Sequence, residues 1–172
     1  MIIRRETPED VDAIRDVTAA AFAKPDGGPA PEVPLIDELR ACDSWLPMLS
    51  LVAVDEAGEV IGHVLCTRGR VDDVPALGLG PLSVRPDRQR AGVGLALMHA
   101  VLGAAEASGE PFVALLGDPA YYSRFGFRAS TDHRITPPDP EWGTYFQVRT
   151  LADHDPGTHG TFTYAEPFDR VS

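Results

Sequence analysis

Lysine is almost absent from this chain, since Lys24 is the only one and the other 14 basic residues are arginines. Acidic residues outnumber basic ones by 26 to 15, which gives a formal net charge of −11. A surface of this charge repels phosphate backbones and anionic lipids, so we expect neither nucleic acid nor a membrane as a partner. Any binding site for an anion must therefore be local.

Cysteines and long apolar runs are also scarce. Cys42 and Cys66 lack the C-x-x-C spacing of a redox or metal motif, so we expect reduced thiols. No apolar stretch approaches the roughly 18–20 residues of a membrane span, and the first residues lack the apolar core of a secretory signal. His133, His154 and His159 share no ligand spacing with acids or cysteines, so we expect no metal. These absences predict a cytoplasmic protein.

The length of 172 residues predicts a single domain, over residues 1–172, that is large enough for a sizeable core. Hydrophobic residues make up 44% and charged residues 24%, a balance that is typical of globular proteins and excludes disordered and coiled-coil chains. The sequence does not determine the oligomeric state and leaves a homodimer open.

Glycine and proline, 16 of each, occur in clusters that mark loops. We expect neither helix nor central strand over Lys24–Pro34 and Thr136–Pro140. Between these breakers, apolar periodicity predicts a mixed α/β fold. Helices are expected over residues 8–22, 33–40 and 92–107 and shortly after Asp118, and strands over residues 2–5, 49–54, 60–67, 75–84, 112–116, 144–151 and 161–165.

The most informative unit is the strand, loop, helix and strand between residues 75 and 116. Its loop, Arg85–Arg90, holds three arginines and one aspartate in an otherwise acidic protein. The loop directly precedes a helix N-terminus, where free amides and the helix dipole attract anions. Gly92 and Gly94 leave room for a phosphate to reach those amides. The pattern predicts a phosphate-binding turn.

Three known phosphate-binding patterns compete for this turn. The P-loop needs a lysine after its second glycine, which excludes it because Lys24 lies elsewhere. The dinucleotide fingerprint needs glycine or alanine where Leu97 stands, so it survives only if the loop before Gly92 is misplaced. The third pattern is Q-x-x-G-x-G, which Gln89–Gly94 matches between a strand and a helix.

Two neighbouring features support a ligand site here. The pair Gly80-Pro81 inside a strand predicts a bulge, which would splay this strand from residues 112–116 and free backbone groups for an amide-containing ligand arm. The segment Gly117–Phe127 predicts a strand-to-helix turn on the same side of the sheet. We expect Asp118 to cap its short helix and the tyrosines to project from it.

Together these blocks resemble the GNAT superfamily of acetyl-CoA-dependent N-acetyltransferases, and most of all a bacterial subgroup with mostly unassigned substrates. The order of elements matches over about residues 1–127, whereas the last 45 residues fit only as completion of the sheet. The resemblance implies a mostly antiparallel twisted sheet with a central splayed pair of parallel strands and flanking helices. The residues similar to the family's pyrophosphate signature are Arg88, Gln89, Arg90, Gly92, Val93 and Gly94.

The resemblance also implies roles for single residues. Backbone groups of Leu82 and Val84, on either side of Ser83, would hold the acetyl carbonyl and the pantetheine arm, and the amides from Gln89 through Ala91 to Gly94 the pyrophosphate. Tyr122, four residues before the Gly-Phe pair, would donate a proton to the departing CoA thiolate. A tyrosine of pKa about 10 is protonated at neutral pH, whereas a thiol of pKa about 8.5 leaves as a thiolate.

The general base is unassigned, because many relatives carry a glutamate on the bulged strand whereas residues 77–82 contain no acid. Asp72 and Asp73 are expected in a solvated turn, and His63 and Tyr121 in the core. For Trp45 both core packing and a place in the acceptor slot remain open, and the Lys24–Pro34 loop is a second candidate for lining that slot.

We therefore expect a cytoplasmic enzyme that transfers an acetyl group from acetyl-CoA to a primary amine of a small molecule or peptide, directly and without an acetyl-enzyme. The alternative is a catalytically silent CoA-binding sensor or partner domain of the same fold. The sequence does not name the acceptor.

Overall fold

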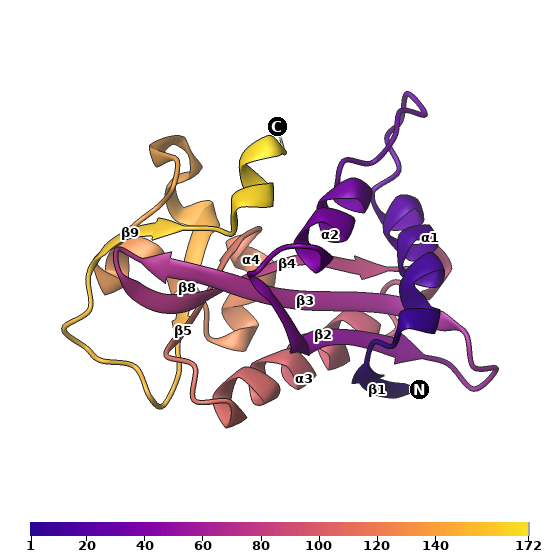
Figure 1. The fold of residues 1–172 in the computed structure, drawn as a ribbon, viewed down its shortest axis with the longest axis horizontal. Coiled ribbons are helices and arrows are strands. Elements are labelled where there is room, and N and C mark those ends of the chain that lie inside the picture. The colour runs from indigo at the N-terminus through magenta and orange to yellow at the C-terminus, as the bar shows by residue number, and fades with distance from the viewer. Residues whose placement is uncertain (172) are drawn as a thin grey trace.

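A twisted sheet runs through the length of the molecule in this computed structural model, which describes residues 1–171 (Figure 1). The strands are β1 (Ile2–Arg5), β2 (Trp45–Val54), β3 (Val60–Val71), β4 (Val74–Val84), β5 (Phe112–Leu116), β6 (Arg128–Ala129), β7 (Ile135–Thr136), β8 (Phe146–Thr150) and β9 (Gly160–Thr163). The helices are α1 (Val11–Ala21), α2 (Glu32–Arg40), α3 (Val93–Ala107) and α4 (Pro119–Tyr122). Short 3₁₀ turns η1 to η6 connect them, of which η5 covers Pro140–Tyr145 and η6 covers Glu166–Arg170.

The sheet is mostly antiparallel, with one parallel pair at its centre. Its strand order is β1-β2-β3-β4-β5-β8-β6, and along this path only β4 and β5 run parallel within the described residues. The strand β9 pairs with β3 and with β7. The connection from β4 to β5 passes through α3, as a parallel pair requires. This architecture confirms the fold class expected from the sequence.

The predicted bulge lies in β4 and separates it from β5. The register between β3 and β4 shifts between the pairs Val64↔Leu82 and Cys66↔Leu79, so β4 holds one additional residue there, at Gly80-Pro81. Parallel pairing with β5 ends at Gly78↔Ala114. Beyond this point the two strands diverge, and the edge of β4 that faces β5 is unpaired from residue 79 to residue 84 within the described chain. The result is a wedge-shaped opening in the middle of the sheet.

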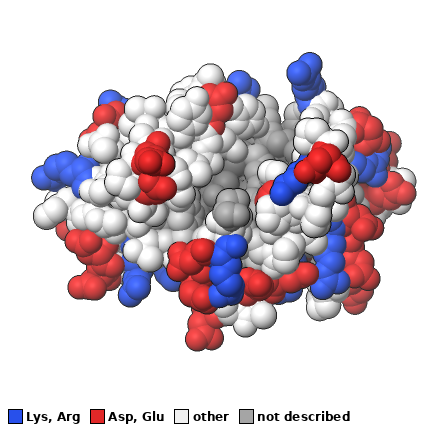
Figure 2. All heavy atoms as spheres, turned by 90° about the horizontal axis from the view of Figure 1, so that it is seen from above, with Lys and Arg blue, Asp and Glu red and all other residues white. Residues whose placement is uncertain are grey.

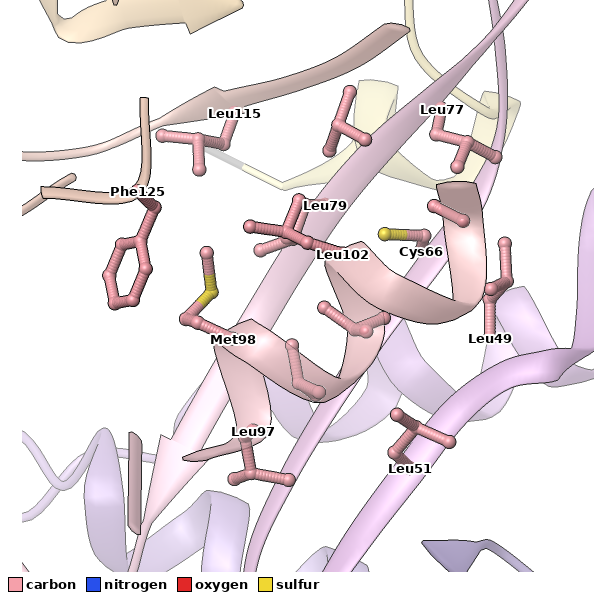
Figure 3. Packing of buried hydrophobic residues seen from close by; sticks show 14 of the residues in the cluster. Leu49, Leu51, Cys66, Leu77, Leu79, Leu97, Met98, Leu102, Leu115 and Phe125 are labelled. Carbon is pink, nitrogen blue, oxygen red and sulfur yellow. The ribbon is translucent and has the colours of Figure 1, made fainter. Parts of the chain in front are cut away.

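Helices cover both faces of the sheet, α3 on one and α1 with α2 on the other (Figure 1). Figure 3 shows Leu97, Met98 and Leu102 of α3 packed among strand residues such as Leu79 and Leu115. On the opposite face, apolar residues of α1 and α2 pack against Val52 and Leu65. Because β3 is covered from both sides, most of its residues are buried. The buried strand β3 therefore holds its neighbour β4, which forms one side of the wedge, in a defined position.

Several expected boundaries needed correction. The helix α2 covers Glu32–Arg40, which confirms the helix expected over residues 33–40 and corrects the expectation of no helix for the last three residues of the Lys24–Pro34 segment. A proline is tolerated there because amides in the first helical turn have no partner within the helix. The strands β2 and β3 extend beyond their expected ends to Trp45 and Val71. No helix within residues 1–171 combines the length and apolar character needed to cross a membrane.

Candidate functional site

The helix α3 begins with a stretch of free backbone amides beside the wedge. Its N-cap is Gly92, whose φ of +86° lies in the left-handed region that suits glycine, and Arg90 is also left-handed, at +62°. Within residues 1–171 no protein acceptor bonds to the amides of residues 90–95, whereas the amide of Ala96 bonds to the Gly92 carbonyl at 3.0 Å. Such a helix start is suited to an anion.

The loop arginines divide into two groups, which the sequence could not distinguish. Arg85 pairs with Asp87 at 2.7 Å and with Glu59 at 3.2 Å, and Arg88 pairs with Asp55 at 3.0 Å. Arg90 makes no ion pair within the described residues and instead lines a cavity at the start of α3. The positive charge available to a ligand from this loop is therefore that of Arg90.

This first cavity has a volume of about 520 Å³ and lies between α1, β4, the start of α3 and the segment after α4. It is lined by Ala21, Phe22, Leu82, Val84, Gln89, Arg90, Gly92, Gly94, Leu95, Tyr121 and Arg124. A Cβ on Gly94 would lie 3.2 Å from Tyr121 Oη, so a side chain larger than that of glycine would crowd the tyrosine hydroxyl. The Arg124 guanidinium lies 4.7 Å from the centre of the Tyr121 ring and adds a second cation.

Four residues of the expected cofactor set do not line this cavity. The Ser83 side chain is buried, with its hydroxyl 3.5 Å from that of Thr18. Val93 packs in the core, and together with Arg88 and Ala91 it borders a separate hollow of about 390 Å³. These residues could therefore serve a cofactor through the backbone only. Gln89 holds the loop in place, since its Nε2 donates to the Val84 carbonyl at 3.3 Å.

A second cavity, of about 770 Å³, lies on the other side of the wedge. Its walls include the diverging strand ends, Leu79–Leu82 of β4 and Leu115–Leu116 of β5. The two cavities share Phe22 and Leu82, so they meet at the bulged strand. The remaining wall comes from the start of α2 and from the last 45 residues. This arrangement allows two ligands to approach one another through the wedge.

Tyr122 lines the second cavity near this junction. Its ring packs against Gly117, where any Cβ would collide with the ring, so the glycine allows the tyrosine to lie flat on the chain. Burial raises the pKa of the Tyr122 hydroxyl to about 12, with a smaller contribution from Tyr121. Among the described residues no group bonds to this hydroxyl, so it is free to donate to a ligand atom. Tyr121 packs against the core, as expected, and it also lines the first cavity, which was not expected.

His63 lies in neither cavity and is part of a buried polar cluster. Its Nε2 lies 2.8 Å from Ser50 Oγ and 3.3 Å from Glu6 Oε1. Burial lowers the pKa of His63, so its ring is neutral at pH 7. Burial by itself would raise the pKa of Glu6, but hydrogen bonds from His63, Arg40 and Ser50 lower it to about 2. The expected place of His63 in the core is confirmed, although its buried Nδ1 has no hydrogen-bond partner among the described residues.

Other candidate residues also have structural roles. Asp118 accepts a hydrogen bond from the Ala120 amide at 2.9 Å, as expected of a helix cap. Asp72 accepts from the Thr161 amide at 2.9 Å and lines neither cavity. Trp45 packs against the core beside Arg40. Cys66 is buried, and burial raises the pKa of its thiol. Within residues 1–171 no three His, Cys, Asp or Glu side chains gather as a set of metal ligands.

The sequence analysis missed several cavity residues. Arg124 lies only two residues after Tyr122, so its cationic side chain in the Gly117–Phe127 segment was a signal that could have been used. The aromatic residues of the second cavity, such as Trp142 and Tyr164, follow no motif and come together only in the folded chain.

A family model, described as an acetyltransferase (GNAT) domain, matches residues 2–130. The chain belongs to the GNAT acetyltransferase family and is by this membership an acyltransferase. Among curated proteins it is 37% identical to the uncharacterized N-acetyltransferase YhbS of Escherichia coli K12, over 99% of both chains.

Solved structures agree with this assignment. A structure of the Escherichia coli YhbS in complex with CoA has a TM-score of 0.88 and 33% identity, covering 99% of this chain and 93% of that one. A GNAT family acetyltransferase from Brucella melitensis in complex with acetyl-CoA has a TM-score of 0.79 and 34% identity, covering 98% and 97%.

Proposed function

We propose that this protein transfers the acetyl group of acetyl-CoA to a primary amine within a ternary complex. The observation that carries the proposal is the meeting of the two cavities at Leu82, on the unpaired edge of the bulged strand. One cavity offers free amides and two cations for a pyrophosphate, and the other offers a route for a second substrate. The relatives whose structures hold CoA or acetyl-CoA support the choice of cosubstrate.

In this proposal acetyl-CoA lies with its diphosphate at the N-terminus of α3, near Arg90 and Arg124. The pantetheine arm, which contains amides, enters the wedge and bonds to the free backbone edge of β4 around Leu82 and Val84. The thioester then lies at the junction of the cavities, close to Tyr122. An enzyme of this kind accelerates the reaction mainly by holding the thioester and the amine close together in the right orientation.

The reaction we propose is one direct displacement. The amine, bound as an ammonium, first releases a proton to solvent at the open side of the second cavity. Its nitrogen then attacks the thioester carbon, a C–N bond forms, and the C–S bond breaks with its electron pair going to sulfur. Tyr122 donates to the sulfur as this charge develops. The nitrogen, which becomes positively charged as the C–N bond forms, loses its second proton to solvent and leaves a neutral amide. Because the pKa of Tyr122, about 12, exceeds that of a thiol, about 8.5, the hydroxyl contributes most while the bond is still breaking, and solvent restores its proton afterwards.

We also propose that the protein acts in the cytoplasm on a soluble amine, without a metal and without nucleic acid or membrane as a partner. The net charge of −11 supports this, since it opposes association with polyanions.

The test is an assay of free CoA thiol from purified protein, acetyl-CoA and a panel of primary amines, combined with thermal unfolding in the presence of acetyl-CoA. We expect acetyl-CoA to raise the unfolding temperature and at least one amine to release CoA at a rate proportional to enzyme concentration. A raised unfolding temperature without CoA release from any amine would instead support the silent CoA-binding domain, for which the missing acid on residues 77–82 is the argument.

A further inference from the structure

The second cavity has walls of aromatic and aliphatic side chains, and four of its six aromatic residues come from the part of the chain that follows the acetyl-CoA motifs. Trp142 in η5, Phe162 and Tyr164 around β9, and Phe168 in η6 all line it. The Tyr164 ring centre lies 4.9 Å from that of Phe162, 4.6 Å from that of Phe168 and 6.4 Å from that of Trp142. The C-terminal segment thus forms a continuous aromatic wall.

This wall is held against the sheet at the root of the wedge. The Tyr164 ring lies directly over Gly78, where a Cβ would come within 2.7 Å of a ring carbon. Gly78 is also the last residue of β4 that pairs with β5. Tyr164 therefore lies where the two strands begin to diverge, in the wall of the second cavity. Its hydroxyl has no hydrogen-bond partner within residues 1–171.

The charges of this cavity have one sign. Glu32, the first residue of α2, and Asp169 in η6 line it, and no Lys, Arg or His side chain does so among the described residues. Neither carboxylate takes part in an ion pair within residues 1–171, although the neighbouring Arg170 pairs with Glu38 and Glu166. Figure 2 shows the face that carries α2 and the C-terminal segment, hollowed between two lobes. Two free carboxylates beside an apolar wall favour a ligand that is cationic at one end.

We propose that the acceptor is a small primary amine with an apolar, preferably aromatic, body. The proposal rests on the acetyl transfer proposed above. The body lies against Trp142, Tyr164 and Phe168, where burial of its apolar surface and contacts between rings stabilise it. Glu32 and Asp169 attract the ammonium before the nitrogen loses its proton and attacks. Free amino acids are disfavoured, because their carboxylate would face these two acids without a cation. Polyamines are disfavoured because further ammonium groups would be desolvated against the aromatic wall.

The test compares four amines with the complete protein and saturating acetyl-CoA. The probes are 2-phenylethylamine, phenylalanine, which adds a carboxylate to the same body, ethanolamine, which lacks the body, and spermidine. We expect kcat/KM for 2-phenylethylamine to exceed each of the others at least tenfold. Equal or better transfer to ethanolamine, spermidine or phenylalanine would overturn the proposal while leaving acetyl transfer itself established.

Two sets of variants assign the preference to the cavity. Trp142→Ala should raise KM for 2-phenylethylamine about tenfold and reduce the ratio of kcat/KM for 2-phenylethylamine to that for ethanolamine at least fivefold. Because this variant removes a packed ring, the double variant Glu32→Gln with Asp169→Asn gives an independent measure, and it should reduce the discrimination against phenylalanine at least fivefold. Glu56→Gln, which neutralises an exposed carboxylate in the turn between β2 and β3, is the matched control. It should change neither the preference for 2-phenylethylamine over ethanolamine nor the discrimination against phenylalanine. Unchanged ratios in both cavity variants would overturn the assignment.

Binding without turnover separates this inference from the proposed reaction. Calorimetry with the complex of protein and CoA should show 2-phenylethylamine binding at least tenfold more tightly than ethanolamine. This binding without transfer to any amine would support the cavity assignment and contradict the proposed reaction. Transfer to other amines with no binding of 2-phenylethylamine would support the proposed reaction and contradict the cavity assignment.

Discussion

Tyr122 and Tyr121 are neighbours in the sequence, yet they face different cavities. Tyr122 lines the second cavity and Tyr121 the first, with their ring centres 4.8 Å apart and the rings nearly perpendicular. Two tyrosines at one short helix thus contribute to opposite sides of the junction. For this reason Tyr121 cannot serve as an inert control in a test of Tyr122.

Tyr122→Phe keeps the ring and removes the hydroxyl. We expect turnover to fall by roughly 10²–10⁴-fold, the usual contribution of a positioned proton donor, with little change in the affinity for acetyl-CoA. Steady-state kinetics with a saturating amine and calorimetry with acetyl-CoA measure the two effects. Tyr145→Phe is the control, because Tyr145 is 55% exposed and lines neither cavity. Near-full turnover when chemistry limits the rate would remove the donor role.

A covalent acetyl-enzyme is not expected. Cys66 is buried, and burial raises the pKa of its thiol, which disfavours the reactive thiolate. The Cys42 thiol lies 3.2 Å from the Leu39 carbonyl, and Cys42 lines neither cavity. Intact mass spectrometry after incubation with acetyl-CoA alone should show the unmodified protein. One acetyl group on a cysteine, removed when amine is added, would contradict direct transfer.

Among the secondary-structure elements, α3 both packs against the sheet and places its N-terminus at the first cavity. Its buried face packs against the sheet, as Figure 3 shows for Leu97, Met98 and Leu102, and this packing fixes the direction of its axis. Its N-terminus therefore points at a defined place, the first cavity. The loop before it neutralises Arg85 and Arg88 and leaves Arg90 free, so charge and helix dipole act at the same point.

Gly92→Glu should abolish or strongly weaken acetyl-CoA binding, since it places a negative charge at the N-terminus of α3. We expect the dissociation constant to rise more than tenfold, measured by calorimetry. Gly92→Asn is the matched control, because asparagine tolerates the left-handed conformation that Gly92 adopts, at φ +86°, and carries no charge. A folded Gly92→Glu protein with unchanged affinity would show that the diphosphate does not lie here.

The loop arginines permit a second comparison. Arg90→Ala should weaken acetyl-CoA binding about tenfold, which corresponds to roughly 1.4 kcal/mol and is in the range of a charge-assisted hydrogen bond. Arg85→Ala should change the affinity less than twofold, because Arg85 is occupied by Asp87 and Glu59. Equal losses in the two variants would mean that the loop acts through its total charge and not through Arg90.

At the scale of the whole molecule, stability depends on a buried cluster that connects three elements. Glu6 follows β1 and bonds to Arg40 at the end of α2 and to His63 in β3. The cluster lies away from both cavities, so its contribution is to stability. Hydrogen bonds lower the pKa of Glu6 and burial lowers that of His63, so at neutral pH the carboxylate is ionised and the imidazole is neutral.

The protein should lose stability as the pH falls below about 6.5. The pKa of folded His63 lies below its usual value of 6.5, so the unfolded chain binds that proton first. The pKa of Glu6 falls from 4.5 to about 2 on folding, so its stabilisation is present above pH 4.5 and is lost as the pH falls towards 2. Urea unfolding between pH 8 and pH 3 measures this. Glu6→Gln should reduce stability at pH 7 by about 3 kcal/mol and flatten the profile below pH 4.5. A profile that is flat in the unaltered protein would contradict this account.

Much of the fold and half of the site follow from the sequence. The bulge at Gly80-Pro81 and the start of α3 at Gly92 were predicted because glycine and proline restrict the backbone locally, whatever surrounds them. The cap by Asp118 is local in the same way. The parallel neighbours β4 and β5 followed from the apolar pattern around an intervening helix. Signals of this kind act over a few residues, so they can be found without the folded chain.

The tertiary structure decided which of these groups can meet a ligand. Arg85, Arg88 and Arg90 carry equal charge in the sequence, but pairing with Glu59 and Asp55 from the turn between β2 and β3 leaves only Arg90 facing the cavity. The wall of the second cavity likewise combines α2 with a segment more than a hundred residues later. Contacts between such distant segments depend on how whole elements pack, and no local pattern records them. The sequence therefore determined the motif that resembles the acetyl-CoA signature, whereas only the folded chain formed the second cavity, in which we propose that the amine binds.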